Sequence, residues 1–390
     1  MFFDREHFHF FRNREIDALY IILALSNLAQ GLISIFVPIY FWELGFEIHR
    51  ILYFYFIDAL YFVSFLLLLL PLIKRLTDKK MIILSIPFSV IYYLGLNYID
   101  SYPILFYILP LFLTLNRIFF NSGYHINFSS VFDKKYVGRE VGFRNMVGQL
   151  VQFSAPFIGG TLISLFGFKF TFNVGVLILF LMIIPLLFFP ERKIVGELST
   201  KSLFIILKDK KILPYSLSSI GYASVTMVGR IIWPLFIFIN IENIRNFGGI
   251  ISLGLLAGLI TTYLVGYLSD SGFREKLLSL TAIISSVIWL SRTFITGILL
   301  ISGNHILGNI VNNGLMVSWS SQFYDISRKT KSKSLFIISQ DFLYNFSRIF
   351  FLPLLMLISY LMKIEQFFSI SFVIAALVTL MYFNANKIKY

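Results

Sequence analysis

Three arginines fall near the middle of long apolar stretches, where a charge is expensive. Arg117, Arg230 and Arg348 have mostly hydrophobic neighbours on both sides. A charged side chain at the centre of a membrane costs roughly 2.5–3.5 kcal/mol on insertion scales, so it survives beside a partner or a wet interior. A guanidinium binds a carboxylate or phosphate through two parallel hydrogen bonds. The arginines predict either an anionic or strongly polar solute held between them, or internal pairing that serves the structure alone.

Two acids also lie within apolar stretches. Asp341, Asn345 and Arg348 are four and three residues apart, so they share one face of a helix. An acid in such a low-dielectric place can carry a proton during a transport cycle, and this is one hypothesis for Asp341. The alternative is an ion pair that neutralises Arg348. For Asp58 the alternatives are the same proton role or that of a helix-end residue directed outward.

Neutral polar side chains in the apolar stretches are the remaining candidates for a solute cavity. Hydrogen bonding between helices is the default interpretation of any one of them. Their concentration on a few helices favours a shared polar interior. The set comprises Asn27, Gln30, Asn116, Asn121, Tyr222, Asn309 and Asn312.

The composition excludes several classes of protein. Of 390 residues, 57% are hydrophobic and 14% charged, whereas a soluble domain has about 25% charged residues. The chain has no cysteine and no His/Glu spacing typical of zinc, so we expect no metal and no cofactor. It has no phosphate-binding loop and no nucleophile elbow, so an ATP-driven pump or an enzyme is not expected. The net charge of +13 allows a nucleic-acid partner, but basic cytoplasmic loops explain it better.

Twelve stretches are long and apolar enough to span a bilayer as helices. They are 16–41, 51–73, 80–98, 103–131, 145–166, 171–190, 213–240, 248–269, 277–294, 298–323, 334–362 and 367–385. The least certain division lies between the ninth and tenth, where residues 302–305 fit a loop as well as a helix.

The placement of basic residues predicts the orientation. With both termini in the cytoplasm, the expected cytoplasmic segments hold 25 of the 33 Lys and Arg residues. The expected external loops hold five, namely Arg50, Lys169, Arg245, Arg292 and Lys363. Such a bias persists only for an even number of spans. We therefore expect a multi-pass protein of the plasma (inner) membrane with a cytoplasmic N- and C-terminus.

The two halves of the sequence look like copies of each other. Pro38 and Pro234 are 196 positions apart, and Pro156 and Pro353 are 197 apart. The sequence predicts a six-helix bundle over 1–190, a cytoplasmic linker over 191–211 with a short amphipathic helix at 202–207, and a second six-helix bundle over 212–390. The four prolines remove helix hydrogen bonds and predict bends. Paired bundles of this kind hold their solute at the interface between halves.

One loop carries a family resemblance. Gly266-Tyr-Leu-Ser-Asp270-Ser-Gly-Phe-Arg274 resembles the signature loop between helices eight and nine of the major facilitator superfamily. The resemblance implies that Gly266, Asp270 and Arg274 form a gating latch on the cytoplasmic side. The equivalent loop in the first half, residues 71–80, departs from the pattern, because proline replaces the glycine and Arg75 the aspartate.

Two further stretches resemble the same family. Arg117 with Asn121 and Gly123 is similar to its helix-four arginine motif, and residues 155–160 (APFIGG) to its helix-five motif, which is associated with exporters. The resemblance implies twelve helices in two pseudo-symmetric bundles, with helices one, four, seven and ten lining the cavity. Arg117 and Arg230 would then face each other from opposite halves.

These observations favour secondary active transport of a small polar solute by alternating access, with an anionic solute, proton coupling and efflux as the preferred variants. The expected partners are the small-molecule substrate, the lipid bilayer and protons, with no nucleic acid, and the expected state is a monomer. Two other functions stay open. One is a non-transporting receptor or scaffold of the same fold, and the other is a membrane-embedded lipid-modifying enzyme.

Overall fold

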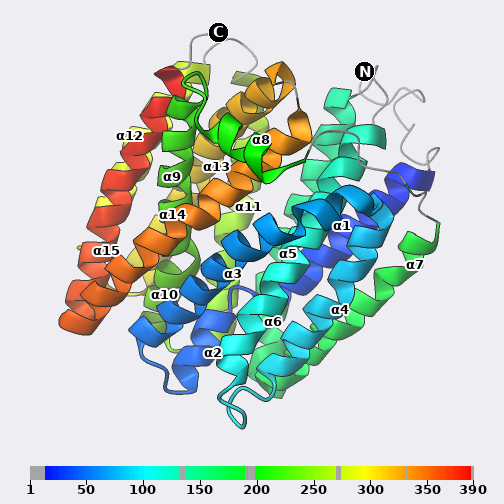
Figure 1. The fold of residues 1–390 in the computed structure, drawn as a ribbon. Coiled ribbons are helices and arrows are strands. Elements are labelled where there is room, and N and C mark those ends of the chain that lie inside the picture. The colour runs from blue at the N-terminus through cyan, green and yellow to red at the C-terminus, as the bar shows by residue number, and fades with distance from the viewer. Residues whose placement is uncertain are drawn as a thin grey trace, which may run out of the picture.

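The computed structural model describes residues 14–131, 137–188, 191, 198–268, 274–330 and 332–387, which are mostly helical (Figure 1). The helices before the linker are α1 (Arg14–Ile33), α2 (Val37–Glu43), α3 (Ile48–Arg75), α4 (Asp78–Leu96), α5 (Leu105–Val131), α6 (Val137–Leu181) and α7 (Ile183–Leu187). After them come α8 (Thr200–Leu207), α9 (Leu213–Met227), the π-helical turn η3 (Val228–Ile232), α10 (Trp233–Ile241), α11 (Ile244–Leu268), α12 (Arg274–Ser291), α13 (Ile298–Lys329), α14 (Lys333–Leu361), α15 (Ile364–Thr379) and the 3₁₀ segment η5 (Leu380–Lys387). We call residues 14–188 the first half and residues 213–387 the second half.

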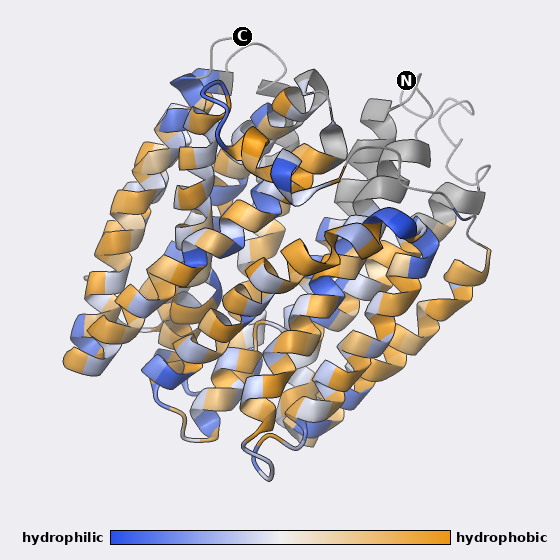
Figure 2. Cartoon of the chain, in the orientation of Figure 1, coloured by the Kyte–Doolittle hydropathy of each residue, from blue (hydrophilic) through white to orange (hydrophobic). Residues whose placement is uncertain are grey.

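Figure 2 shows hydrophobic residues along most of the length of the helices, and many large apolar side chains are exposed, as contact with lipid requires. Phe294 and Leu299 are each 85% exposed, and Leu68 is 70% exposed. Nine described segments are long and apolar enough to cross a membrane. One of them, residues 148–187, is 40 residues long. That is about twice the length a bilayer core needs, and Gly167, at φ 83°, divides it. The all-α membrane fold is thereby confirmed, while the count of twelve crossings stays a prediction.

The boundary between the expected ninth and tenth helices is clear in the structure. α12 ends at Ser291 and α13 begins at Ile298, directly after Gly297 with φ 78°. Residues 302–305 are helical within α13 and form no loop. α12 and α13 are not among the nine apolar segments. In α13 the reason is its polar content, since five Asn and His side chains fall within residues 304–313.

Pro38 and Pro234 lie at matching interruptions of two long helices. A three-residue turn at 34–36 separates α1 from α2, and Pro38 lies in the first turn of α2. Pro234 lies in the first turn of α10, directly after the π-turn η3. Proline donates no N–H, and its ring collides with the carbonyl four residues earlier. The carbonyls affected belong to residues 34 and 230. Pro156 and Pro353 lie inside α6 and α14.

The two halves meet along two pairs of helices, α3 with α14 and α6 with α11. Figure 1 shows α3 beside α14. Between α6 and α11 the backbones nearly touch, because a Cβ on Gly160 would lie 2.7 Å from the carbonyl oxygen of Ile244. The Phe157 N–H, next to Pro156, donates across this interface to Ser252 Oγ at 2.9 Å. Small residues thus let the halves approach closely, as they do in other membrane interfaces.

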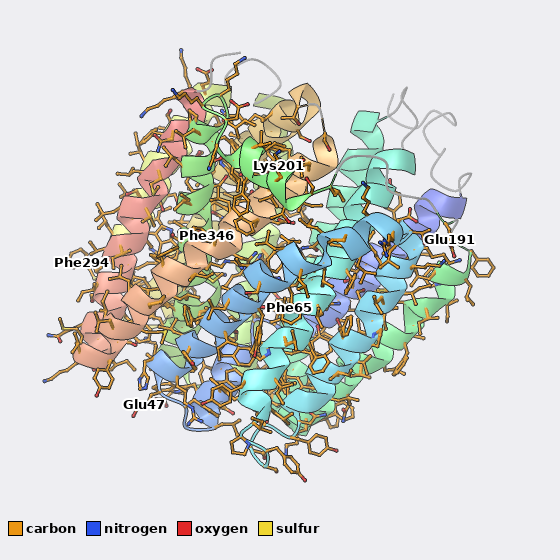
Figure 3. The ribbon with its side chains drawn as sticks, viewed as in Figure 1. Glu47, Phe65, Glu191, Lys201, Phe294 and Phe346 are labelled. Carbon is orange, nitrogen blue, oxygen red and sulfur yellow. The ribbon has the colours of Figure 1, made fainter. Side chains whose placement is uncertain are left out.

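The short helix α8 seals one end of the α3–α14 pair. Leu203 of α8 is fully buried in a cluster with Phe62 and Leu66 of α3 and with Ile338 and Phe342 of α14. Figure 3 shows Lys201 of α8 at one end of the bundle and Glu47 at the opposite end. The start of α1 and the end of η5 lie at the same end as α8 (Figure 1). The helix falls where the sequence predicts an amphipathic segment.

Candidate solute site between the two halves

Asp58 and Arg117 form a buried ion pair within the first half. Arg117 Nη1 of α5 lies 2.5 Å from Asp58 Oδ2 of α3. Thr114, one turn before Arg117, donates to Asp58 Oδ1 at 2.8 Å. Asp58 is 4% exposed, so it is not a helix-end residue directed outward. Pairing and hydrogen bonding together allow a carboxylate to stay ionised at this depth.

Asn345 connects this ion pair to the second half. Its side-chain oxygen accepts from Arg117 Nη2 at 3.0 Å and from Arg348 Nη1 at 2.9 Å. Asn345 is 2% exposed and Arg348 is 8% exposed. One neutral amide oxygen therefore holds two guanidinium groups, one from each half. The Nε of Arg348 is buried and has no hydrogen-bond partner in the described structure.

Asp341 lies on the same face of α14, as the spacing predicts, but it makes no salt bridge with Arg348 in the described structure. The Asn345 amide donates to the Asp341 backbone carbonyl at 2.8 Å, and no described side chain donates to the carboxylate. Arg117 and Arg348 are close enough to act on the carboxylate electrostatically. The expected ion pair of the interior is made by Asp58 and Arg117 instead.

Arg230 lies at the centre of the π-turn η3, four residues before Pro234. Pro234 donates no hydrogen bond to the carbonyl of residue 230 and its ring displaces that carbonyl, so the backbone here widens from an α-helical to a π-helical turn. Its side chain is exposed, yet it is within electrostatic range of Arg348 and of Tyr55, which are interior residues of α14 and α3. The guanidinium therefore faces the space between the halves and not the lipid. No carboxylate in the described ranges lies within salt-bridge distance of it.

Along α1–α2 and along α9–η3–α10, exposed polar residues give way to buried ones just before Pro38 and Pro234, respectively. Gln30 and Ser34 are exposed, whereas residues 36–41 are buried. In the second half Tyr222 is half-buried and Arg230 exposed, whereas residues 231–235 are buried. Beyond this depth α2 contacts α10, and the rings of Phe36 and Phe247 are 5.6 Å apart. Buried apolar side chains therefore close the space between the halves at the end that carries α2 and α10.

The other predicted cavity residues divide into accessible and structural ones. Asn27 and Asn121 are half-buried and Asn312 is exposed. Asn116 is buried and donates to the Ser85 carbonyl at 3.0 Å, and Asn309 donates to the His305 carbonyl at 2.9 Å, so both serve packing. Tyr222 stacks on Trp319 with ring centroids 4.7 Å apart.

One of the three residues of the predicted gating latch lies outside the described residues. Asp270 falls in the interval 269–273, of which nothing is described, so its expected role stays a prediction. Gly266 lies near the end of α11, and Arg274 begins α12. The sequence-based site also omitted three residues, Thr114, Tyr344 and Arg292. The first lies one turn from Arg117, which was the available signal for it.

Charges and polar groups enclosed between two helical halves, within an apolar exterior, define a membrane transport protein. The chain belongs to the Major Facilitator Superfamily, whose family model matches residues 19–352.

Two similar solved structures agree with this assignment. The crystal structure of the nucleoside transporter NupG has a TM-score of 0.73 at 13% identity, over 96% of this chain and 99% of that chain. An aspartate-to-alanine mutant of NupG has a TM-score of 0.72 at 13% identity, over 97% of this chain and 100% of that chain. No curated protein sequence matches. At this identity the likeness concerns the fold, and it is the family that indicates a transporter rather than an enzyme.

Proposed function

We propose that the chain is a secondary active transporter that moves a small anionic or strongly polar solute by alternating access. The observation that carries the proposal is Arg230, an accessible guanidinium between the halves with no acid partner in the described structure. An accessible guanidinium with no acid partner is free to bind a solute carboxylate or phosphate through a bidentate contact. Tyr222 and Asn312, also accessible, provide further polar contacts.

The charge balance of the interior supports an anion. Three arginines, Arg117, Arg230 and Arg348, face two acids, Asp58 and Asp341. Asp58 is fully engaged by Arg117 and Thr114, which leaves Asp341 as the acid free to exchange a proton. We assign Asp341 the role of proton carrier, because protonating it changes the charge beside Arg348 and thereby the affinity for an anion. The helix-five motif favours export as the direction.

The alternating-access step follows from the contacts between the halves. The structure is closed where α2 meets α10, and the glycine contacts of α6 and α11 let the halves rock against each other. Opening the closed end requires separating the apolar side chains around Phe36 and Phe247. In this proposal the gating residues Gly266, Asp270 and Arg274 hold the opposite end closed in the other state.

A second candidate solute is a nucleoside. NupG is a nucleoside transporter, and the present chain has an aromatic group beside the polar face. Tyr222 stacks on Trp319 and meets Tyr344 edge-on with ring centroids 5.1 Å apart. A planar base binds well against such rings. This candidate requires no charge on the solute and therefore makes no use of Arg230.

A thermal-shift screen of the purified protein tests the solute class. The ligands are a dicarboxylate, inorganic phosphate, a sugar phosphate, uridine and a cationic amine. We expect the anions to raise the unfolding temperature in the wild type and the Arg230→Ala substitution to abolish that rise. Arg245→Ala is the matched control, because Arg245 is an exposed arginine at the start of α11. Stabilisation by uridine alone, unchanged in Arg230→Ala, would favour the nucleoside.

Uptake into proteoliposomes, with and without a pH gradient, tests transport and coupling. Accumulation of the stabilising ligand only with the gradient, lost in Asp341→Asn, is the expected result. Exchange that ignores the gradient would contradict proton coupling but not transport. The absence of any flux with a ligand that binds would favour the receptor or scaffold over the transporter.

A further inference from the structure

The guanidinium of Arg292 is buried between two tryptophan rings. Arg292 directly follows α12 and is 6% exposed, although the sequence places it in an external loop. Its Cζ lies 3.9 Å from the ring centroid of Trp233 and 3.8 Å from that of Trp289. Cation–π contacts are strongest when, as here, the cation is desolvated. The cation is thus held by two faces and not by an acid.

Further contacts fix the orientation of the guanidinium. Its Nε donates to Asn304 Oδ1 at 2.9 Å, and the Asn304 amide donates to Ser291 Oγ at 2.8 Å. The close fit over α13 requires a glycine, because a Cβ on Gly308 would lie 2.7 Å from Arg292 Nη2. Arg292 therefore ties the end of α12 to α13 with little freedom of rotation.

Trp233, the first of the two rings, follows the π-turn directly. Its indole Nε1 donates to His305 Nδ1 at 3.0 Å. Its ring also packs against Phe236 and Phe372, with centroids 5.5 Å and 5.7 Å away. The C-terminal end of the π-turn is consequently anchored to α13 and α15 through one side chain.

Trp289, the second ring, lies near Gly229 of the π-turn. A Cβ placed on Gly229, the residue before Arg230, would lie 3.9 Å from the Trp289 ring, so a side chain at this position would touch the ring. Arg292 therefore holds two tryptophans, one beside residue 229 and one directly after residue 232, and Arg230 lies between these two points.

We infer that Arg292 is a positioning residue for Arg230, acting through Trp233 and Trp289 to hold the π-turn. A π-turn has poorer geometry than the α-helix and persists where its surroundings hold it. Without the bridging cation the two tryptophans no longer fix the turn, and the residue 230 side chain shifts away from the accessible face, although Pro234 still prevents a regular α-helix there. The inference rests on the proposed function only for the use of Arg230 in binding a solute.

Arg50 also lies over two aromatic rings but has no positioning role. Its Cζ lies 4.4 Å and 5.4 Å from the centroids of Phe46 and Phe106. Arg50 is exposed, and neither ring belongs to the turn at 34–36 or to η3. A surface contact of this kind contributes ~0.5–1 kcal/mol. Arg50→Gln is therefore the matched control for Arg292 variants.

Cysteine labelling tests the inference without a solute, because the chain has no cysteine of its own. Arg230→Cys reports on the π-turn, and Ser34→Cys reports on the equivalent interruption of the first half, where Ser34 is exposed. Each is labelled with a small water-soluble methanethiosulfonate in backgrounds carrying Arg292→Gln, Arg292→Lys or Arg50→Gln. We expect Arg292→Gln to slow labelling at position 230 by about fivefold, a local change that one kcal/mol produces. Labelling at position 34 stays unchanged.

The lysine variant separates positioning from charge. Lysine keeps the charge but lacks the planar group that both rings cover. We expect Arg292→Lys to slow labelling at position 230 almost as much as Arg292→Gln, and this variant carries the test where Arg292→Gln fails to purify. Unchanged or faster labelling at position 230, or an equal change at both positions, would overturn the inference.

The same variants distinguish this inference from the proposed function. If labelling shifts as expected but no anion stabilises even the wild type, the proposed function fails and the positioning role stands. If anions stabilise the wild type and labelling is unaffected by either Arg292 substitution, the positioning role fails and the proposed function stands.

Discussion

The two halves treat their interior arginines differently. In the first half Arg117 meets Asp58 directly, so the pair is neutral. In the second half Arg348 has only the shared amide of Asn345, and Arg230 has no acid partner in the described ranges. A buried charge without an opposite charge is costly. The second half therefore holds positive charge that a bound anion would compensate, whereas the charges of Asp58 and Arg117 in the first half compensate each other.

Corresponding helix ends show the same contrast. Asn97 follows α4 by one residue, and Arg292 follows α12 by one residue, 195 positions later. Asn97 makes a neutral hydrogen bond to Asn173 Oδ1 at 2.9 Å. Arg292 is a cation between two tryptophans. The neutral Asn97 lies in the first half, where the turn at 34–36 carries no charge. The cationic Arg292 lies in the second half and contacts Trp233, next to the turn that carries Arg230.

This difference indicates a division of labour. A repeated fold needs only equivalent helices and interruptions in its halves, and both halves have them. Binding a charged solute requires an imbalance, which two equal halves with matched charges would not provide. Substitutions that exchange the character of the halves should therefore separate stability from solute binding.

The largest expected effect comes from removing the charge of Asp58. Asp58→Asn keeps the shape but leaves the half-buried Arg117 without an acid, which costs about 3 kcal/mol of the free energy of unfolding, at the low end for an uncompensated charge. Thermal unfolding in detergent, followed by intrinsic fluorescence, measures it. Adding Arg117→Gln to Asp58→Asn removes the uncompensated charge as well, so we expect the double variant to recover most of the lost stability.

A contrast with Arg348 sharpens this first prediction. Arg348 has no acid within salt-bridge distance in the described structure, so Arg348→Gln removes a costly charge, while Arg117 still acts electrostatically on the Asp341 carboxylate. We expect its unfolding temperature to equal or exceed that of the wild type. If both Asp58→Asn and Arg348→Gln destabilise the protein equally, the halves are not balanced differently.

The next effect concerns solute binding rather than stability. Asn345→Asp places a carboxylate between Arg117 Nη2 and Arg348 Nη1, whose hydrogen bonds then become charge-assisted. The second half thereby gains the acid it lacks. We expect stability to be maintained and the apparent affinity for the stabilising anion to fall about tenfold, equivalent to ~1.4 kcal/mol. Ligand titrations of the thermal shift measure it. An unchanged anion affinity would show that Asn345 lies outside the electrostatic field of the site.

Much of this architecture could be predicted because it depends on local patterns. Hydropathy and length indicated the helical segments, and prolines marked the interruptions at Pro38 and Pro234. Helical spacing placed Asp341, Asn345 and Arg348 on one face. These features follow from periodicity within one segment, which a single sequence contains.

The partners of the charged residues could not be predicted, because they depend on how helices rotate and pack. Nothing in the sequence links Asp58 to Arg117 rather than Asp341 to Arg348. The sequence predicts an external loop for Arg292 because it is a basic residue at the end of an apolar stretch. Its burial depends on Trp233 and Trp289, which come from two different helices. The aromatic group of Tyr222, Trp319 and Tyr344 has the same origin in tertiary packing.

The smallest expected effect concerns the exposed charges of the first half. Lys169 Nζ lies 3.1 Å from Asp100 Oδ2 on the loop after α4, and both side chains are largely exposed. The hydrogen bond from Lys169 lowers the pKa of the Asp100 carboxyl below its usual value. A lowered pKa in the folded state contributes stability above the unfolded pKa of about 3.9, and this contribution is lost as pH falls through the folded pKa.

Because water screens exposed pairs, we expect Asp100→Asn to match the wild type in unfolding temperature at pH 7. Between pH 7 and about pH 4 the unfolding temperatures of the two proteins should agree within error. Below about pH 4 the unfolding temperature of the wild type should fall slightly more steeply. A loss at pH 7 as large as that of Asp58→Asn would mean that an exposed pair supports the first half as strongly as the buried one, and the contrast drawn from burial would fail.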